Sequence, residues 1–307
     1  MLKIKLIGTG IFISLLLIIF LTVNAAGFKN SVISTSPLFT DTAVECVAFD
    51  AVNLTVSGLA EEDADKIPAI LMNQKATKFV AQYVKNNSEL LSRIKEKNPG
   101  YFKIMDSVFT HFNLPLELKY LAIVESELKS KAVSKVGAVG AWQFMPSTAR
   151  LLSLKVTAKY DERKHFYKST VAAAKYLAYL HKVYKDWLLV LAAYNSGPGT
   201  VNMAIKKSGS RNFWKLQYFL PVETRGHVKR FIATHYYYEG RGGVTTLTKA
   251  ELATYTKKVK NFVDTINAEI LAETTNEMLA MENNVTINKE SVLATKMNTA
   301  LQLNEDK

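Results

Sequence analysis

The residue best placed to do chemistry in this sequence is a glutamate at the end of an apolar helical stripe. The segment LELKYLAIVESEL, residues 116–128, places Leu118, Leu121 and Ala122 on one helix face. Glu125 comes next on that face, at the end of an otherwise core-facing row. Burial disfavours the charged form of a carboxyl, and a carboxyl that keeps its proton near neutral pH can act as a general acid. The spacing therefore predicts an acid–base group at Glu125.

A simpler interpretation of the same helix stays open at this point. Glu125 and Lys129 are one turn apart, and such a pair forms a surface ion pair worth a few tenths of a kcal/mol (about 0.2–0.5). Glu127 is not expected to join Glu125 in catalysis, because residues two apart on a helix point to different sides.

The segment that follows combines small residues with flat and polar ones. Glycines in GAVG, residues 137–140, allow the backbone to approach a ligand closely. Trp142 and Phe144 offer faces on which a sugar ring can lie, and Gln143 between them carries both a donor and an acceptor. The composition fits either a glycan-binding loop or a tight turn before a helix.

Four short motifs in this order resemble the soluble lytic transglycosylase domain family, over roughly residues 75 to 240. They are Glu125-Ser126, then GAVGAWQFMP, then Ala193-Tyr194-Asn195 with the turn SGPG, then Glu223-Thr224-Arg225. The resemblance implies a mainly α, lysozyme-like (goose-type or lytic transglycosylase) catalytic domain with a long glycan groove, here carrying helical extensions.

The resemblance also implies roles for individual residues. Glu125 would be the only general acid and base. The substrate-binding residues would be Ser126, Ser134, Gln143, Tyr194, Asn195 and Glu223. Among them, Ser134 would bond the N-acetyl side of the muramoyl sugar, Tyr194 and Asn195 would flank the cleavage point, and Glu223 would orient nearby groups.

The implied activity is cleavage of the β-1,4 bond between N-acetylmuramic acid and N-acetylglucosamine in peptidoglycan, with formation of a 1,6-anhydro ring and without water. Ordinary glycosidases need two carboxylates. Asp161 and Glu162 are interpreted as solvated loop charges, although the fold could still bring Asp161 or Glu223 to the site. A goose-type lysozyme and a non-catalytic wall-binding protein remain alternatives.

One position departs from the family pattern. The family usually has Tyr before the Val that follows the Glu-Thr pair, and this chain has His227 there. Histidine is shorter and titrates near neutral pH, which leaves its role open between a site residue and a solvent-facing helix residue. No convincing copy of the peptidoglycan-binding repeats found after many such domains is seen in the tail.

The elements that must position these residues are predicted to be short helices. Apolar spacing is of helix type from Leu71 to Tyr238. Pro115 and Pro221 are expected to open helices, and Gly197 and Gly240 to follow helix ends. Candidate N-caps are Ser169 and Thr170 for one helix and Asp186 for the next.

Four segments are predicted. Residues 1–25 read as a signal peptide or an uncleaved membrane anchor, since two lysines precede an apolar run that ends in small residues. Residues 26–70 look like a linker, residues 71–245 form the catalytic domain, and residues 246–307 form a helix-prone or partly disordered tail. The protein is therefore expected in the periplasm or cell envelope, with possible membrane association through the N-terminal apolar segment.

The composition limits partners and cofactors. The chain has 307 residues and a net charge of +12, which suits an anionic partner such as the cell wall, while no groove-reading motif supports nucleic acid. Cys46 is the only cysteine, so an intramolecular disulfide is excluded. The five histidines show no metal-ligand spacing, and no cofactor is expected.

Overall fold

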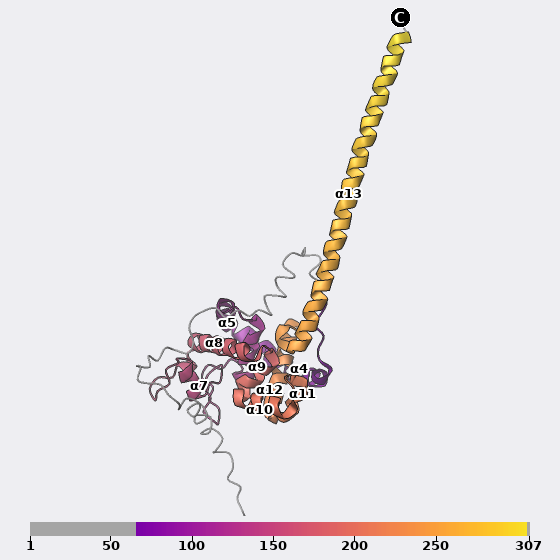
Figure 1. The fold of residues 1–307 in the computed structure, drawn as a ribbon. Coiled ribbons are helices and arrows are strands. Elements are labelled where there is room, and N and C mark those ends of the chain that lie inside the picture. Colours follow the sequence, from indigo (N-terminus) through magenta and orange to yellow (C-terminus); the bar gives the residue numbers. More distant parts are fainter. Residues whose placement is uncertain (1–65, 306–307) are drawn as a thin grey trace, which may run out of the picture. The chain divides into compact units, whose positions relative to one another are not determined.

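The computed structural model describes residues 66–305, which form helices joined by turns and by longer loops, among them residues 127–145 (Figure 1). Extended pairing within that range is limited to isolated bridges, two of them in the loop of residues 133–144. The predicted mainly α fold is confirmed for these residues. The helices are α4 Gln74–Lys97, α5 Pro99–His111, η1 Leu116–Lys119, α6 Tyr120–Ser126, α7 Pro146–Leu151, η2 Glu162–Lys164, α8 Phe166–Tyr184, α9 Trp187–Ser196, α10 Pro198–Ser208, α11 Phe213–Leu216, η3 Gln217–Phe219, α12 Val222–Glu239, η4 Val244–Thr246 and α13 Lys249–Glu305.

The described residues divide into two compact units. The first contains Ile70–Leu252, and the second contains residues 66–69 and the chain from Ala253 onward. The predicted signal or anchor segment, nearly all of the predicted linker and Cys46 lie outside the described residues. Among residues 66–305, no helix combines the length and the apolar character that crossing a bilayer requires.

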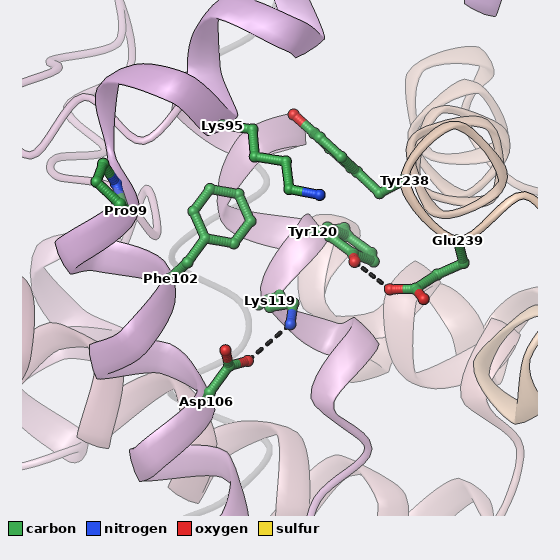
Figure 2. A pocket seen from close by; sticks show the side chains of 8 residues that line it. All are labelled: Lys95, Pro99, Phe102, Asp106, Lys119, Tyr120, Tyr238 and Glu239. Atoms are coloured by element: carbon green, nitrogen blue, oxygen red, sulfur yellow. Dashed lines mark hydrogen bonds and ion pairs between the residues drawn. The ribbon is translucent and has the colours of Figure 1, made fainter.

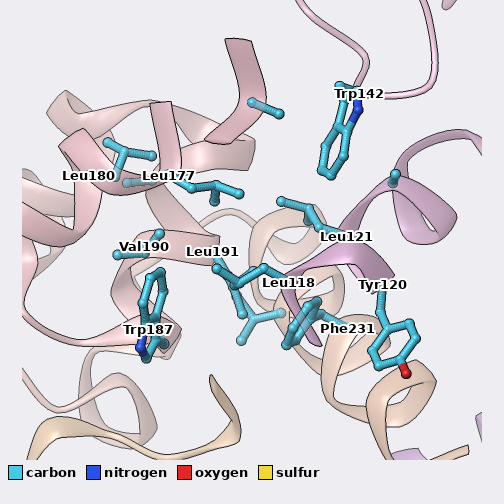
Figure 3. Close-up of a cluster of buried hydrophobic side chains, with 14 of the residues drawn as sticks. Leu118, Tyr120, Leu121, Trp142, Leu177, Leu180, Trp187, Val190, Leu191 and Phe231 are labelled. Atoms are coloured by element: carbon cyan, nitrogen blue, oxygen red, sulfur yellow. The ribbon is translucent and has the colours of Figure 1, made fainter. Parts of the chain in front are cut away.

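Helix α9 forms the centre of the first unit. Its residues from Trp187 to Ala193 are all buried, and a helix that is apolar on every side needs neighbours on every side. Helices α8, α10 and α12 pack against it. Figure 3 shows Trp187, Val190 and Leu191 among the buried side chains, with Leu177 of α8 and Phe231 of α12 beside them.

The helix caps were predicted with mixed success. Asp186 caps α9 as expected, because its Oδ1 accepts a hydrogen bond from the Leu189 backbone N–H at 3.2 Å. Ser169 and Thr170 as N-caps were wrong, since α8 begins earlier, at Phe166, with His165 as its cap. Both hydroxyls instead donate to the backbone oxygen of Phe166 inside the helix, a bond that such residues make with the preceding turn.

Candidate active site

Glu125 lies at the edge of the core, as the stripe predicts. Leu118, Leu121 and Ala122 are fully buried, and Glu125 keeps 12% of its side-chain surface exposed. The segment is a 3₁₀ turn followed by α6 and not one α-helix from Pro115. The carboxylate therefore touches both the apolar interior and solvent.

The chain turns sharply just after this carboxylate. Glu127 and Leu128 both have left-handed backbone angles, with φ of 56° and 62°, which end α6 at Ser126. Lys129 lies beyond the helix and its Nζ pairs with Glu127 Oε2 at 2.6 Å. The interpretation of Glu125 as a surface ion-pair partner of Lys129 is therefore wrong.

A histidine from a distant helix contacts the candidate acid. His227 Nε2 of α12 lies 2.9 Å from Glu125 Oε1, although the two residues are 102 positions apart. The His227 side chain is only 2% exposed, so the solvent-facing interpretation is wrong. Its second ring nitrogen, Nδ1, is buried and has no hydrogen-bond partner among the described residues.

The loop of residues 133–145 is fixed against the helices that carry the site. The Ser126 hydroxyl donates to the backbone oxygen of Ala141 at 2.8 Å, and the Tyr194 hydroxyl donates to that of Trp142 at 2.8 Å. Trp142 and Phe144 are both buried, so the prediction that they offer faces to a sugar ring is wrong, and the Trp142 indole N–H instead donates to Thr170 Oγ1 at 3.0 Å. Three helices, α6, α8 and α9, thus hold one short segment next to Glu125.

Ser134 and Gln143 shape this loop from within. Ser134 Oγ accepts the backbone N–H of Ala138 at 2.9 Å, and Gln143 Nε2 donates to the backbone oxygen of Gly140 at 2.8 Å. Gln143 itself adopts a left-handed φ of 47°. Both side chains remain half-buried, so each keeps some surface for a ligand.

Arg163 holds this loop through contacts that the sequence analysis did not predict. Its guanidinium donates to the backbone oxygens of Gly137 and Phe144, each at 2.9 Å, and pairs with Asp161 at 2.8 Å. This arginine holds the pKa of the Asp161 carboxyl below its ordinary value. The only trace in the sequence is an arginine directly after two acidic residues.

The interpretation of Asp161 and Glu162 as solvated loop charges is therefore wrong. Glu162 is buried and accepts hydrogen bonds from Lys168 Nζ and from the Lys155 backbone N–H, both at 2.6 Å. These contacts, the lysine ammonium first, lower the pKa of the Glu162 carboxyl. Asp161 is therefore engaged by Arg163, and Glu162 by Lys168 and the Lys155 backbone, so both carboxylates stabilise the loops near the site.

Tyr194 and Asn195 lie in the last turn of α9. Burial raises the pKa of the Tyr194 phenol well above its ordinary value, and the negative charge of Glu125 raises it further. Asn195 Oδ1 accepts the Thr224 hydroxyl at 2.8 Å, which ties α9 to α12. Glu223, next to Thr224 in the first turn of α12, is exposed, and its part in the site rests on the resemblance alone.

A separate pocket of about 370 Å³ is not this site. It is lined by Lys95, Phe102 and Tyr238 among others, with Lys119 paired to Asp106 at 2.7 Å and Tyr120 donating to Glu239 (Figure 2). Glu239 and His227 are separated on α12 by twelve residues, or about 18 Å along the axis. The charged groups of this pocket already have partners within it, since Lys119 pairs with Asp106, Glu239 accepts from Tyr120 and Lys95 lies over the Tyr238 ring.

The arrangement around Glu125 suits proton transfer by one carboxyl group. The carboxyl is held by a buried imidazole, bordered by a protonated phenol and partly open to solvent. Within residues 66–305, no group of three histidine, cysteine or acidic side chains is arranged to hold a metal ion.

Comparison with known proteins agrees with the motifs. Residues 111–217 match the family described as Transglycosylase SLT domain, which confirms the resemblance and includes every predicted site residue except Glu223. Membrane-bound lytic murein transglycosylase D of Escherichia coli, in strains K12 and O6:H1, is 39% identical over 166 residues, or 52% of this chain and 36% of that protein. The chain thus matches about a third of the length of these relatives.

A solved structure is also similar. The 70 kDa soluble lytic transglycosylase of Escherichia coli aligns with 66% of this chain and 34% of its own, at 22% identity and a TM-score of 0.45. The fold described above rests on this chain's own helices and not on that likeness.

Proposed function

We propose that this chain, with its transglycosylase SLT domain, is a peptidoglycan lytic transglycosylase in which Glu125 is the single general acid and base. It would cleave the β-1,4 bond between N-acetylmuramic acid and N-acetylglucosamine and leave a 1,6-anhydro ring. The observation that carries the proposal is the position of Glu125, partly buried at the end of α6 within the matched residues 111–217.

The proposed reaction returns Glu125 to its starting state. The bond between muramoyl C1 and the glycosidic oxygen breaks, its electron pair stays on that oxygen, and the oxygen takes the proton of Glu125. The neighbouring acetamido oxygen can stabilise C1 meanwhile. The muramoyl 6-hydroxyl oxygen then bonds C1 and gives its proton to Glu125. Intramolecular attack can have a high effective molarity, so an activated water is not required.

The site favours this reaction over hydrolysis of the lysozyme kind. An inverting hydrolase needs a second group to activate water, and a retaining one that uses no group of the substrate as nucleophile needs a second carboxylate close to the acid. His227 is poorly suited to be that base, because Nε2 bonds Glu125 and Nδ1 is buried. Asp161 and Glu162 are engaged by Arg163 and Lys168.

The remaining predicted residues would bind the glycan. Ser134 and Gln143 lie in the loop anchored by Ser126, and Tyr194 holds that loop through the Trp142 backbone. Asn195 would flank the cleavage point, and Glu223 would orient groups at the start of α12. A location in the cell envelope follows from the substrate, and the Escherichia coli relative is named membrane-bound.

The experiment compares the purified chain with Glu125→Gln and Glu127→Gln on intact peptidoglycan. Glu127 is a matched control, since it ends the same helix and pairs with Lys129. Released muropeptides are weighed by mass spectrometry. We expect products lighter by one water than reducing-end muropeptides from the unmodified chain and Glu127→Gln, and none from Glu125→Gln.

Other products would redirect the assignment. Reducing-end muropeptides would mean a lysozyme-type hydrolase. Retained binding to peptidoglycan, with no product from any of the three proteins, would mean a wall-binding protein without catalysis.

A further inference from the structure

The contact between His227 and Glu125 involves one particular oxygen of the carboxyl group. His227 Nε2 lies 2.9 Å from Oε1, which is hydrogen-bond distance. The imidazole is 2% exposed and the carboxyl 12% exposed, so the bond is largely shielded from water. A contact of this kind can distinguish Oε1 from Oε2.

The environment of the second ring nitrogen decides where the imidazole proton lies. A neutral imidazole has one N–H and one lone pair, whereas an imidazolium has two N–H groups. Nδ1 is buried with no partner among the described residues. A buried N–H without an acceptor is rarer in proteins than a buried acceptor without a donor. The neutral form with its proton on Nε2 is therefore favoured, and that proton points to Glu125 Oε1.

The ring is held in place by the helix that carries it. Val228 and Phe231 of α12 are fully buried, and the Thr224 hydroxyl one turn earlier bonds Asn195 of α9 at 2.8 Å. An imidazole on such a helix has little freedom to turn away from its partner. The donor is thus in place before a substrate arrives.

We propose that His227 is a positioning residue that holds Glu125 Oε1 through its Nε2–H and so leaves Oε2 as the oxygen that carries the catalytic proton. This inference rests on the proposed function. The bond to Oε1 is compatible with both protonation states of the carboxyl group, because Oε1 accepts as a carbonyl oxygen or as a carboxylate oxygen.

Both proton transfers then involve the same oxygen atom, Glu125 Oε2. Oε2 gives its proton to the glycosidic oxygen as the bond to C1 breaks and the electron pair stays on that oxygen. Oε2 later receives the proton of the muramoyl 6-hydroxyl as the new bond to C1 forms. His227 keeps its own proton throughout, and it stabilises the carboxylate that exists between the two transfers.

A spectroscopic experiment tests the proton position independently of activity. The chain is labelled with ¹⁵N, and the imidazole signals are recorded near neutral pH, with His227 assigned by its loss in His227→Gln. We expect His227 to be neutral with its proton on Nε2. A proton on Nδ1, or an imidazolium, would overturn the proposal.

A kinetic comparison tests the consequence. His227→Leu removes the donor, His227→Gln keeps a side-chain N–H that cannot titrate, and His235→Leu is the matched control, since His235 is equally buried on the same helix. We expect kcat of His227→Leu to fall about 10-fold to 100-fold, the equivalent of one hydrogen bond to a carboxylate. KM should change little, and His227→Gln should recover most of kcat.

The outcomes separate the two proposals. Unchanged kcat in His227→Leu, or equal loss in His227→Gln and His227→Leu, would overturn the role of His227 while anhydro products from the unmodified chain uphold the function. If the unmodified chain gives no product, the proposed function fails, and the role of His227 in proton transfer fails with it. The ¹⁵N spectrum then still reports whether the Nε2–H bond exists.

Discussion

Gly140 shows how closely the loop beside Glu125 is fitted to the rest of the domain. Its φ is +89°, and a Cβ placed there would lie 2.0 Å from the backbone oxygen of Arg163. The neighbouring Gly137 has nearly the same φ, +88°, but nothing within 4 Å of such a Cβ. Alanine substitutions at the two glycines can therefore distinguish the cost of the left-handed backbone conformation from the cost of the close contact.

Gly140→Ala is expected to destabilise the protein by about 2–4 kcal/mol, because a left-handed conformation costs about 1–2 kcal/mol and overpacking adds a similar amount. Gly137→Ala should cost only the first part. Urea unfolding followed by near-UV circular dichroism measures both free energies of unfolding. Equal losses of unfolding free energy in the two variants would show that relieving the contact with the Arg163 backbone costs no stability.

At the scale of the element, the C-terminal end of α8 carries a lysine where a glycine would be more stable. Lys185 follows α8 in a left-handed conformation, with φ of 52°, and its backbone N–H donates to the His181 oxygen at 2.8 Å. Glycine is the usual residue at this position, because it adopts this conformation without steric cost.

Lys185→Gly should therefore stabilise the protein by about 0.5–1 kcal/mol. Lys182→Gly, the same change at an exposed position inside the last turn of α8, should destabilise it by about 1 kcal/mol. Thermal unfolding of both variants at one pH measures the two shifts. If Lys185→Gly did not stabilise the protein, or if both variants changed its stability in the same direction, the assignment of Lys185 as the helix cap would be contradicted.

Element ends also show what local sequence signals can predict. Asp186 caps α9 and Gly240 ends α12 with φ of 68°, because both residue types satisfy the local backbone by themselves. Ser169 and Thr170 failed as caps because the same hydroxyls bond equally well to a preceding turn. The apolar stripe placed Glu125 correctly at the core edge, since burial follows the helix period.

At the scale of the whole molecule, the contacts that complete the site could not be read from local spacing. Glu125 meets His227 across 102 residues, and Arg163 reaches back to the oxygens of Gly137 and Phe144. Periodicity identifies which side of each helix is buried but not which helix lies opposite. The mainly α class was predictable, whereas the partner of the candidate acid was not.

Folding stability is expected to fall as the pH drops from about 6.5 to 4. Burial lowers the pKa of His181 and of His235 to about 4, so the unfolded chain binds two protons in this range that the folded chain does not. Each histidine contributes up to about 3 kcal/mol, fully present above pH 6.5 and lost toward pH 4. Asp186 opposes this, because burial raises its pKa to about 6 and the folded chain gains stability as that carboxyl is protonated.

Urea unfolding at several pH values between 4 and 7 measures the net slope, which should correspond to about one proton. His235→Leu removes one of the two titrating histidines, so the free energy of unfolding of this variant should change much less with pH over the same range. A slope identical to that of the unmodified chain would contradict the contribution of His235.

The separation of Glu125 and His227 along the chain also has a consequence for biosynthesis. Glu125 is made 102 residues before His227, so a growing chain carries the candidate acid long before its partner has been synthesised. The pair forms only after α12 has left the ribosome and docked against α6 and α9. The candidate site is therefore completed only when nearly all of the first unit has been synthesised and folded.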